Sequence, residues 1–114
     1  PFVDIDAEIE LSDITPKFYN ILQQMAPFGP MNMRPIFLTK DVKDAGYTQL
    51  LKDEHLKLHI TKSGQRSVFG IGFGMWYLIP IIRNNTTFNV CYHLYENEWN
   101  GNKRIELQVK DIQA

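Results

Sequence analysis

Apolar and polar residues alternate with a period of two in five segments that follow residue 35. A period of two places every second side chain on the same face of a β-strand, so each segment offers one apolar face for burial. In chain order, the expected strands are residues 36–42, 55–61, 67–73, 87–95 and 104–110. The pattern predicts a mainly β fold in which every strand contributes one face to a common core.

The alternation in the second and third expected strands predicts which of their side chains are buried. We expect burial of Leu56, Leu58 and Ile60 in the second strand and of Phe69, Ile71 and Phe73 in the third. The opposite face of the second strand carries His55, Lys57 and His59. The opposite face of the third includes Gly70 and Gly72, and glycines within a strand mark a bend or a close backbone approach, as a tightly coiled barrel requires.

The segments between the strands indicate how they connect. Residues 62–65 are short enough for a hairpin, and Asn100-Gly101 is a strong hairpin signal. Residues 74–85 are too long for a tight turn and favour a short helix that plugs the barrel, with Trp76 and Tyr77 in the core. Five strands with an insertion after the third match the OB-fold, a small barrel that often binds single-stranded nucleic acid or oligosaccharide.

One α-helix is predicted ahead of the strands. Thr15 is a suitable cap, and Pro16 suits the first helical position because its missing N–H has no partner there. Apolar residues then follow the spacing of one helical face over 18–25, and prolines and a glycine over 27–30 end the helix. We expect an acidic lead-in with a junction helix at 1–33 and an OB-fold domain at 34–114.

The chain has 114 residues, a length that suits one globular domain. Its net charge is −1, so the overall charge gives no sign of nucleic-acid binding. Residues 1–33 hold five acidic residues and one basic residue, and 34–114 hold eight acidic and eleven basic. Ligand binding is therefore expected in the second part. Cys91 is the single cysteine, which excludes an internal disulfide and fits a reducing, cytoplasmic compartment.

No segment reads as a membrane span or a signal peptide. The apolar, uncharged stretch at residues 68–82 is shorter than the ~20 residues needed to cross a bilayer. The first residue is Pro1 rather than methionine. We therefore expect a piece of a longer protein that does not bind membranes.

The row of His55, Lys57 and His59 is the most informative local pattern. Three basic or titratable side chains on one strand face can meet phosphates, although a solvated strand face would show the same pattern. The two histidines lie roughly 13 Å apart along a strand, too far to share a metal ion. Cys91 and His93 share a face without a visible third ligand, so no metal site is expected.

Trp99 lies in the expected turn between the last two strands. It can stack on a nucleotide base or fold over the end of the barrel, and the sequence leaves both open. The segment Gly70-Ile71-Gly72-Phe73-Gly74 lacks the spacing of a phosphate-binding loop. Because no nucleophile motif or paired carboxylates are visible, we expect this chain alone not to be an enzyme.

Several blocks together resemble the OB domain of the bacterial RecJ family, the single-stranded-DNA-specific exonucleases. The stretch from Ala26 to Phe37, APFGPMNMRPIF, resembles the family's "PFG-x-x-N-x-x-P-x-F" junction. Five further segments of this sequence resemble blocks of the same family: DAE at 6–8, HLK at 55–57, IGFG at 71–74, NEWNG at 97–101 and LQVKDI at 107–112. The blocks follow the family order and cover nearly the whole chain.

The resemblance implies a parent enzyme that degrades single-stranded DNA in the 5′-to-3′ direction during recombination and repair. Its Mn²⁺ or Mg²⁺ would be held by aspartates and histidines of a DHH-type catalytic core, whose motifs are absent from this sequence. The resemblance also implies that this piece is a C-terminal OB domain that grips the strand. The expected partners are single-stranded DNA, the parent's own catalytic domains and repair proteins.

Sequence-tolerant binding of single-stranded DNA is therefore the function we expect. The residues expected to contact it are Arg34, His55, Lys57, His59, Arg66, Trp99, Lys103, Arg104 and Lys110. The cations would meet phosphates with the two histidines assisting, and Trp99 would stack. The alternative is an OB module for protein contact, docking on the catalytic core or on a repair partner, which the apolar segment 74–85 favours. A third class of function, a hydrolase in its own right, would need metal-dependent nuclease activity from this chain, and we expect none.

Overall fold

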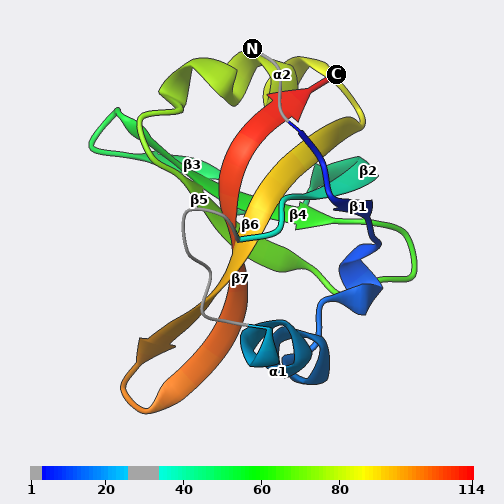
Figure 1. Cartoon of the computed structure of the whole chain (residues 1–114). Coiled ribbons are helices and arrows are strands. Elements are labelled where there is room, and N and C mark those ends of the chain that lie inside the picture. The colour runs from blue at the N-terminus through cyan, green and yellow to red at the C-terminus, as the bar shows by residue number, and fades with distance from the viewer. Residues whose placement is uncertain (1–3, 26–33) are drawn as a thin grey trace.

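The computed structural model describes residues 4–25 and 34–114. The strands are β1 (Ala7–Glu8), β2 (Phe37–Asp44), β3 (Gln49–Leu51), β4 (His55–Thr61), β5 (Val68–Gly72), β6 (Phe88–Trp99) and β7 (Asn102–Gln113). Five of these strands, β2, β4, β5, β6 and β7, close into a barrel (Figure 1). The sheet order is β1-β2-β6-β7-β5-β4-β3, and a further pairing of β2 with β4 closes the ring. β5 and β7 run parallel, whereas the other pairs in the ring are antiparallel. This confirms the predicted OB-fold.

Within the described residues, four short helices accompany the strands: η1 (Leu11–Asp13), α1 (Pro16–Gln24), η2 (Trp76–Leu78) and α2 (Ile79–Asn84). α1 confirms the predicted helix, because Thr15 Oγ1 accepts a hydrogen bond from Phe18 N at 3.1 Å and Pro16 opens the helix. The residues expected to end it, 27–30, and most of the family-like junction lie outside the described residues. η2 and α2 confirm the expected helix after the third strand.

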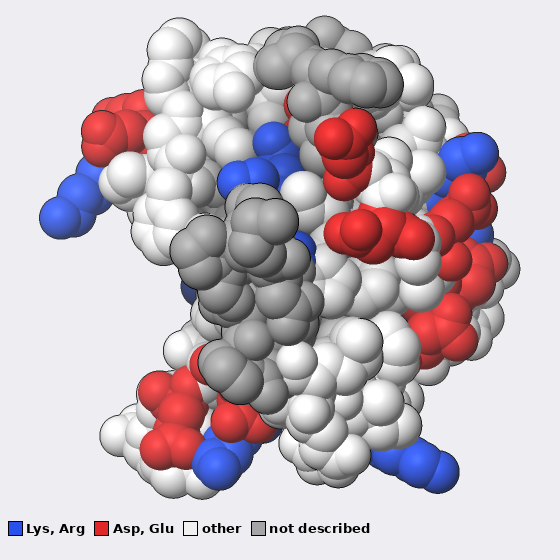
Figure 2. Space-filling model, in the orientation of Figure 1, with Lys and Arg blue, Asp and Glu red and all other residues white. Residues whose placement is uncertain are grey.

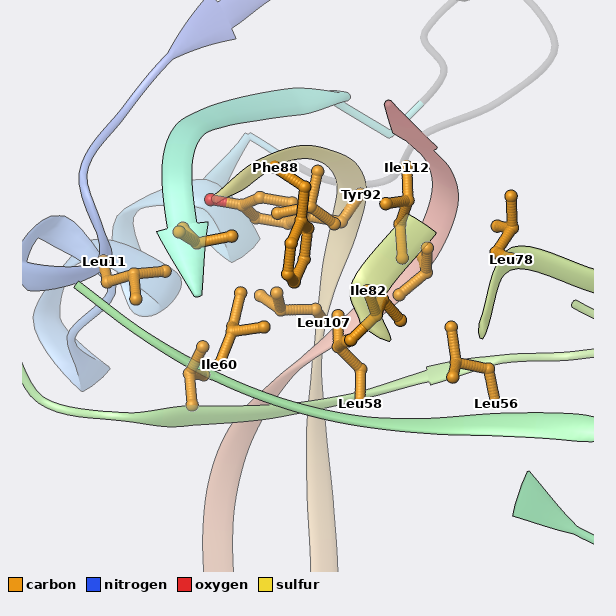
Figure 3. Close-up of a cluster of buried hydrophobic side chains, with 14 of the residues drawn as sticks. Leu11, Leu56, Leu58, Ile60, Leu78, Ile82, Phe88, Tyr92, Leu107 and Ile112 are labelled. Atoms are coloured by element: carbon orange, nitrogen blue, oxygen red, sulfur yellow. The ribbon is translucent and has the colours of Figure 1, made fainter. Parts of the chain in front are cut away.

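The barrel interior is apolar, and side chains from the short helices complete it (Figure 3). Leu56, Leu58 and Ile60 of β4 are fully buried, as predicted. Leu78 of η2 and Ile82 of α2 are also buried in this core. Trp76 and Tyr77 were expected in the core, and this expectation is wrong: they are 54% and 56% exposed.

β5 turns the opposite face inward from the one expected. Val68 and Gly70 are buried, whereas Phe69 is partly exposed and Phe73, just beyond the strand, is 63% exposed. A Cβ placed on Gly70 would lie 3.0 Å from both Cβ and O of Leu107 in β7. The inward side of this strand therefore has no room for a large side chain, and the aromatic rings are directed outward.

β6 and β7 form a hairpin that extends beyond the barrel (Figure 1). Asn100 and Gly101 have positive φ angles of 49° and 78°, the conformation of a two-residue type I′ turn. The hairpin signal is thus confirmed, but both strands are longer than predicted. Trp99 is the last residue of β6, paired with Asn102, and does not lie in the turn.

The acidic lead-in lies against the barrel. β1 pairs in parallel with β2, and Leu11 of η1 is buried within the core. Lys62 Nζ lies 2.8 Å from a carboxylate oxygen of Glu10. Acidic side chains gather over the β1 and η1 region (Figure 2). The described lead-in therefore covers one side of the barrel and gives that side a negative charge.

Candidate nucleic-acid interface

Strand register brings side chains from four strands onto one outer face of the sheet. His59 of β4 is opposite Phe69 of β5, and Ile71 is opposite Gln108 of β7. Gln108 is in turn opposite His93 of β6. Because alternate residues share a face, the outward residues of β4, β5, β7 and β6 form a continuous surface across the sheet.

Five side chains on this surface form a line of ring and guanidinium contacts, which we call the stacked row. Its members are Tyr47, His59, Phe69, Arg104 and Trp99. The rings of His59 and Phe69 are stacked, with centroids 4.1 Å apart and planes inclined by 17°. The guanidinium carbon of Arg104 lies 4.4 Å from the Phe69 ring centroid and 4.8 Å from that of Trp99. Such contacts fix the planar groups relative to one another.

The two ends of the stacked row are open to solvent. Tyr47 is 71% exposed and Trp99 is 42% exposed. Base–aromatic stacking contributes roughly 1–3 kcal/mol per base and tolerates any sequence, because every base has a π face. The stacked row therefore offers two exposed rings on which bases can continue the stack.

His59 is covered by its neighbours within this surface, which differs from the open row of three side chains expected. It is 5% exposed, and its Nδ1 has no hydrogen-bond partner among the described residues. Burial lowers the pKa of His59, with Arg104 adding to the decrease and Asp44 opposing it. The structure therefore places His59 as a covered ring stacked on Phe69, where an outward side chain was expected.

His55 is already engaged by its neighbours. Its Nδ1 accepts a hydrogen bond from Gly74 N at 2.9 Å, and its Nε2 lies 3.2 Å from a carboxylate oxygen of Glu54. The ring also meets Phe73 edge-on, with centroids 5.7 Å apart. These contacts place His55 at the edge of the surface, away from the stacked row.

Lys57 is the central cation of β4. Its Nζ lies 5.8 Å from the ring centroid of Phe69, and no carboxylate among the described residues pairs with it. The sequence correctly placed Lys57 on the outward face, and the structure adds that it lies beside Phe69 of the stacked row.

Arg66, Lys103 and Arg104 line one groove of about 600 Å³. Ile14 and Pro16 of the lead-in also line this groove. No ion pair to Arg66 occurs within the described residues, whereas Lys103 lies 3.7 Å from Glu98 and 4.0 Å from Glu96. The groove adjoins the stacked row because Phe69 and Arg104 belong to both.

Arg34 and Lys110 lie at the other end of the surface. Arg34 Nη2 donates to Gln108 Oε1 at 3.2 Å and to Leu94 O at 3.4 Å. Burial lowers the pKa of His93, and a hydrogen bond with Pro35 O raises it. The charges of Arg34 and Lys110 lower this pKa further. The two cations therefore lie close enough to His93 to affect its titration, away from the groove.

Two members of the stacked row, Tyr47 and Phe69, were not among the predicted contact residues. Phe69 was assigned to the core because its alternation with Ile71 reads as an apolar face. The glycines opposite were the available signal, because a face made of Gly70 and Gly72 leaves space only for close backbone packing. Tyr47 lies outside the strands, and nothing in the alternation identified it.

Neither a metal-binding cluster nor a membrane-spanning helix occurs in the described residues. No group of three or more His, Cys, Asp or Glu side chains among residues 4–25 and 34–114 could hold a metal ion. Within the same ranges, no helix has the length and apolar character needed to cross a membrane.

Comparisons with known proteins agree with the architecture. The family model described as the RecJ OB domain matches residues 5–111. The single-stranded-DNA-specific exonuclease RecJ of Bacillus subtilis (strain 168) is 25% identical over 116 residues, which cover 97% of this chain and 14% of that protein. The crystal structure of Thermus thermophilus RecJ in complex with Mn²⁺ matches with a TM-score of 0.70 and 20% identity, over 98% of this chain and 16% of that one.

A second Thermus thermophilus structure, RecJ in complex with Mg²⁺, matches with a TM-score of 0.62 and 22% identity, over 87% of this chain and 14% of that one. The chain thus spans a small fraction of each relative. The family match covers most of the chain, and the closed five-strand ring is the fold that the resemblance implies. This chain belongs to the RecJ OB domain family.

Proposed function

We propose that this chain is the single-stranded-DNA-binding OB module of a longer RecJ-type exonuclease. The observation that carries the proposal is the stacked row, flanked by Lys57 on the outer face and by the groove that Arg66 lines. Stacking surfaces beside cations suit an unpaired polynucleotide, which presents both bases and phosphates. A duplex suits this surface less well, because its bases already stack on one another and do not offer free faces to the exposed rings.

The residues take different parts in this proposal. The predicted phosphate contacts remain Arg34, Lys57, Arg66, Lys103, Arg104 and Lys110. Trp99 supplies an exposed ring for a base, and the ring of His59 stacks on that of Phe69. His55 contributes at the edge, where it also orders Gly74. Lys103 is the weakest cation of the set, because Glu96 and Glu98 already oppose its charge.

The proposal extends to the longer protein only through its relatives. The Bacillus subtilis relative is named as a single-stranded-DNA-specific exonuclease, and the Thermus thermophilus structures hold Mn²⁺ or Mg²⁺. We infer that the parent of this chain cleaves single-stranded DNA in the 5′-to-3′ direction with one of these ions, in the cytoplasm and in recombination and repair. The metal and the cleavage chemistry would belong to other domains, with this module holding the strand.

Fluorescence anisotropy with labelled oligo(dT) tests the proposal. Because each neutralised phosphate contributes about 0.7 to the slope of log affinity against log salt, contacts from four to six cations predict a slope of about −3 to −4. Affinity that is absent at low salt, or that does not change with salt, would contradict the proposal.

Three alanine variants assign the surface. Lys57→Ala and Trp99→Ala should each weaken binding, by roughly 1 kcal/mol or more for the stacking residue. Lys17→Ala, on the exposed lead-in helix α1, is the matched lysine control and should bind as the unsubstituted chain does. Equal losses in all three variants would show that the outer face of the sheet is not the binding surface.

A second candidate function is docking on the parent's own catalytic core. Three exposed aromatic residues favour it: Trp76 and Tyr77 of η2, and Phe73, whose ring meets His55. Exposed rings of this kind are enriched at protein interfaces. Calorimetric titration of the isolated catalytic core with this chain, and with Trp76→Ala, measures the contact. Equal affinity of the two chains for the core would exclude this surface.

A further inference from the structure

Glu106 is a buried carboxylate on the face that we propose binds an anionic polymer. It is 5% exposed. Its Oε1 accepts a hydrogen bond from Tyr95 Oη at 2.9 Å, and its Oε2 accepts from Arg104 Nε at 2.7 Å and from Asn97 Nδ2 at 3.4 Å. A buried carboxylate is costly unless it is paired and hydrogen-bonded, and this one has three donors.

The hydrogen bonds hold the carboxylate from two strands. Tyr95 and Asn97 belong to β6, whereas Glu106 and Arg104 belong to β7. Burial, together with the hydrogen bond and the charge of Glu106, raises the pKa of Tyr95. The tyrosine therefore remains a donor throughout the physiological pH range, and the carboxylate has a fixed position between the strands.

The bond between Glu106 and Arg104 uses only one of the five N–H groups of the guanidinium. Within the described residues, the two terminal nitrogens of Arg104 donate no hydrogen bond. The guanidinium also contacts the rings of Phe69 and Trp99. Glu106 thus fixes the inner edge of the group and leaves its four outer N–H groups available.

We propose that Glu106 is a positioning residue, which holds Arg104 in the stacked row so that its terminal N–H groups donate to a phosphate of single-stranded DNA. The inference rests on the proposed function and deepens it, because it names a residue that acts on the ligand through another. An arginine held in place loses less conformational entropy on binding than a free one. Arginine is also suited to this arrangement, since its plane stacks while its edges donate.

The proposal predicts a result opposite in sign to simple electrostatics. Glu106 is negative, so its neutralisation makes the face more positive and would by charge alone tighten the binding of DNA. If Glu106 positions Arg104, its neutralisation releases the guanidinium and weakens binding. The direction of the change therefore separates the two explanations.

The first experiment measures oligo(dT) affinity by anisotropy for Glu106→Gln, which keeps the size of the side chain and an acceptor oxygen. We expect affinity to fall about fivefold to tenfold, the coupling typical of residues in one hydrogen-bond network. Glu98→Gln, a matched change at an exposed carboxylate on the same hairpin, should bind equally well or more tightly. Unchanged or tighter binding by Glu106→Gln would overturn the proposal.

A double-mutant cycle with Arg104→Ala tests whether Glu106 acts through Arg104. In the Arg104→Ala background, Glu106→Gln should cause no further loss of affinity, because there is no guanidinium left to position. An equal loss in both backgrounds would assign Glu106 to the general stability of the hairpin and overturn the proposal. Thermal unfolding of each variant sets a measuring temperature at which all of them are folded.

A measurement without DNA separates the inference from the proposed function. In a ¹H–¹⁵N NMR spectrum, the Nε–H signal of Arg104 should be protected from exchange in the unsubstituted chain and lose protection in Glu106→Gln. Tyr95→Phe, which removes a donor to the other carboxylate oxygen, should cause a smaller loss. Equal protection in all three chains would overturn the inference. Failure of the unsubstituted chain to bind oligo(dT) would overturn the proposed function and, with it, the ligand assigned to Arg104.

Discussion

The two faces of β5 carry opposite kinds of side chain. Toward the interior it presents Val68 and Gly70, which are buried and allow β5 and β7 to approach closely. Toward the outside it presents Phe69, which contacts His59, Lys57 and Arg104. One strand therefore closes the barrel with its small side chains and builds the candidate interface with its large ones. Stability and binding should respond separately to changes on the two faces.

The largest effect is expected on the interior face. Leu58→Ala removes a fully buried side chain from the centre of β4, opposite Gly70. The lost contacts and the remaining cavity should lower the free energy of unfolding by roughly 2–5 kcal/mol. Urea denaturation measures this change. A loss below about 1 kcal/mol would show that the interior near β5 is loosely packed.

The close approach between β5 and β7 should be the next most sensitive feature. Gly70→Ala places a Cβ at 3.0 Å from both Cβ and O of Leu107, and backbone at that distance cannot move away cheaply. We expect a destabilisation of roughly 1–3 kcal/mol by urea denaturation. Ser67→Ala, at an exposed position just before the strand, is the control and should change stability by less than about 0.5 kcal/mol. Equal stability of the two variants would contradict the close approach.

On the outer face, the main effect should be on binding. Phe69→Leu retains apolar volume but removes the ring that contacts both His59 and Arg104. Affinity for oligo(dT) should fall by roughly 1 kcal/mol, or about fivefold, while the free energy of unfolding changes by less. Anisotropy and urea denaturation of the same sample compare the two. A variant that loses stability and keeps its affinity would reverse our assignment of the two faces.

The smallest expected effect is a dependence of stability on pH. Burial lowers the pKa of His59 and of His93 in the folded chain, so the unfolded chain binds more protons as the pH falls through the ordinary histidine value of about 6.5. Stability should therefore be complete above this range and decrease below it. Denaturation at pH 7.5 and pH 5.5 measures the loss. His59→Phe should reduce it, and an unchanged loss in that variant would show that His59 does not contribute.

Local patterns predicted the individual strands, the helix and the hairpin turn, because short-range chemistry determines each of these. The alternation in β4, the Thr15 cap and the Asn100-Gly101 turn all depend on neighbours in the sequence. The direction in which β5 faces depends instead on its approach to Leu107, a residue far along the chain. The periodicity was correct there, but it could not decide which face is inside when one face is aromatic and the other is mostly glycine.

The candidate site was only partly predictable for the same reason. Chemical type alone points to Lys57, Arg104 and Trp99, and the register of three strands brings Arg104 into contact with Trp99 and with Phe69. The burial of His59 under its neighbours requires contacts between strands that no local pattern contains. Trp76 lies in an apolar stretch of sequence that suggests burial, whereas its side chain is exposed on η2.

Chemical-shift mapping with oligo(dT) tests the central claim most directly. Titration of the ¹⁵N-labelled chain should shift the backbone amides of Tyr47, Phe69 and Arg104 and the indole N–H of Trp99, and should leave Glu8 and Lys17 of the acidic lead-in unchanged. Shifts concentrated in the lead-in, or an unchanged spectrum at millimolar DNA, would show that the stacked row is not a surface for single-stranded DNA.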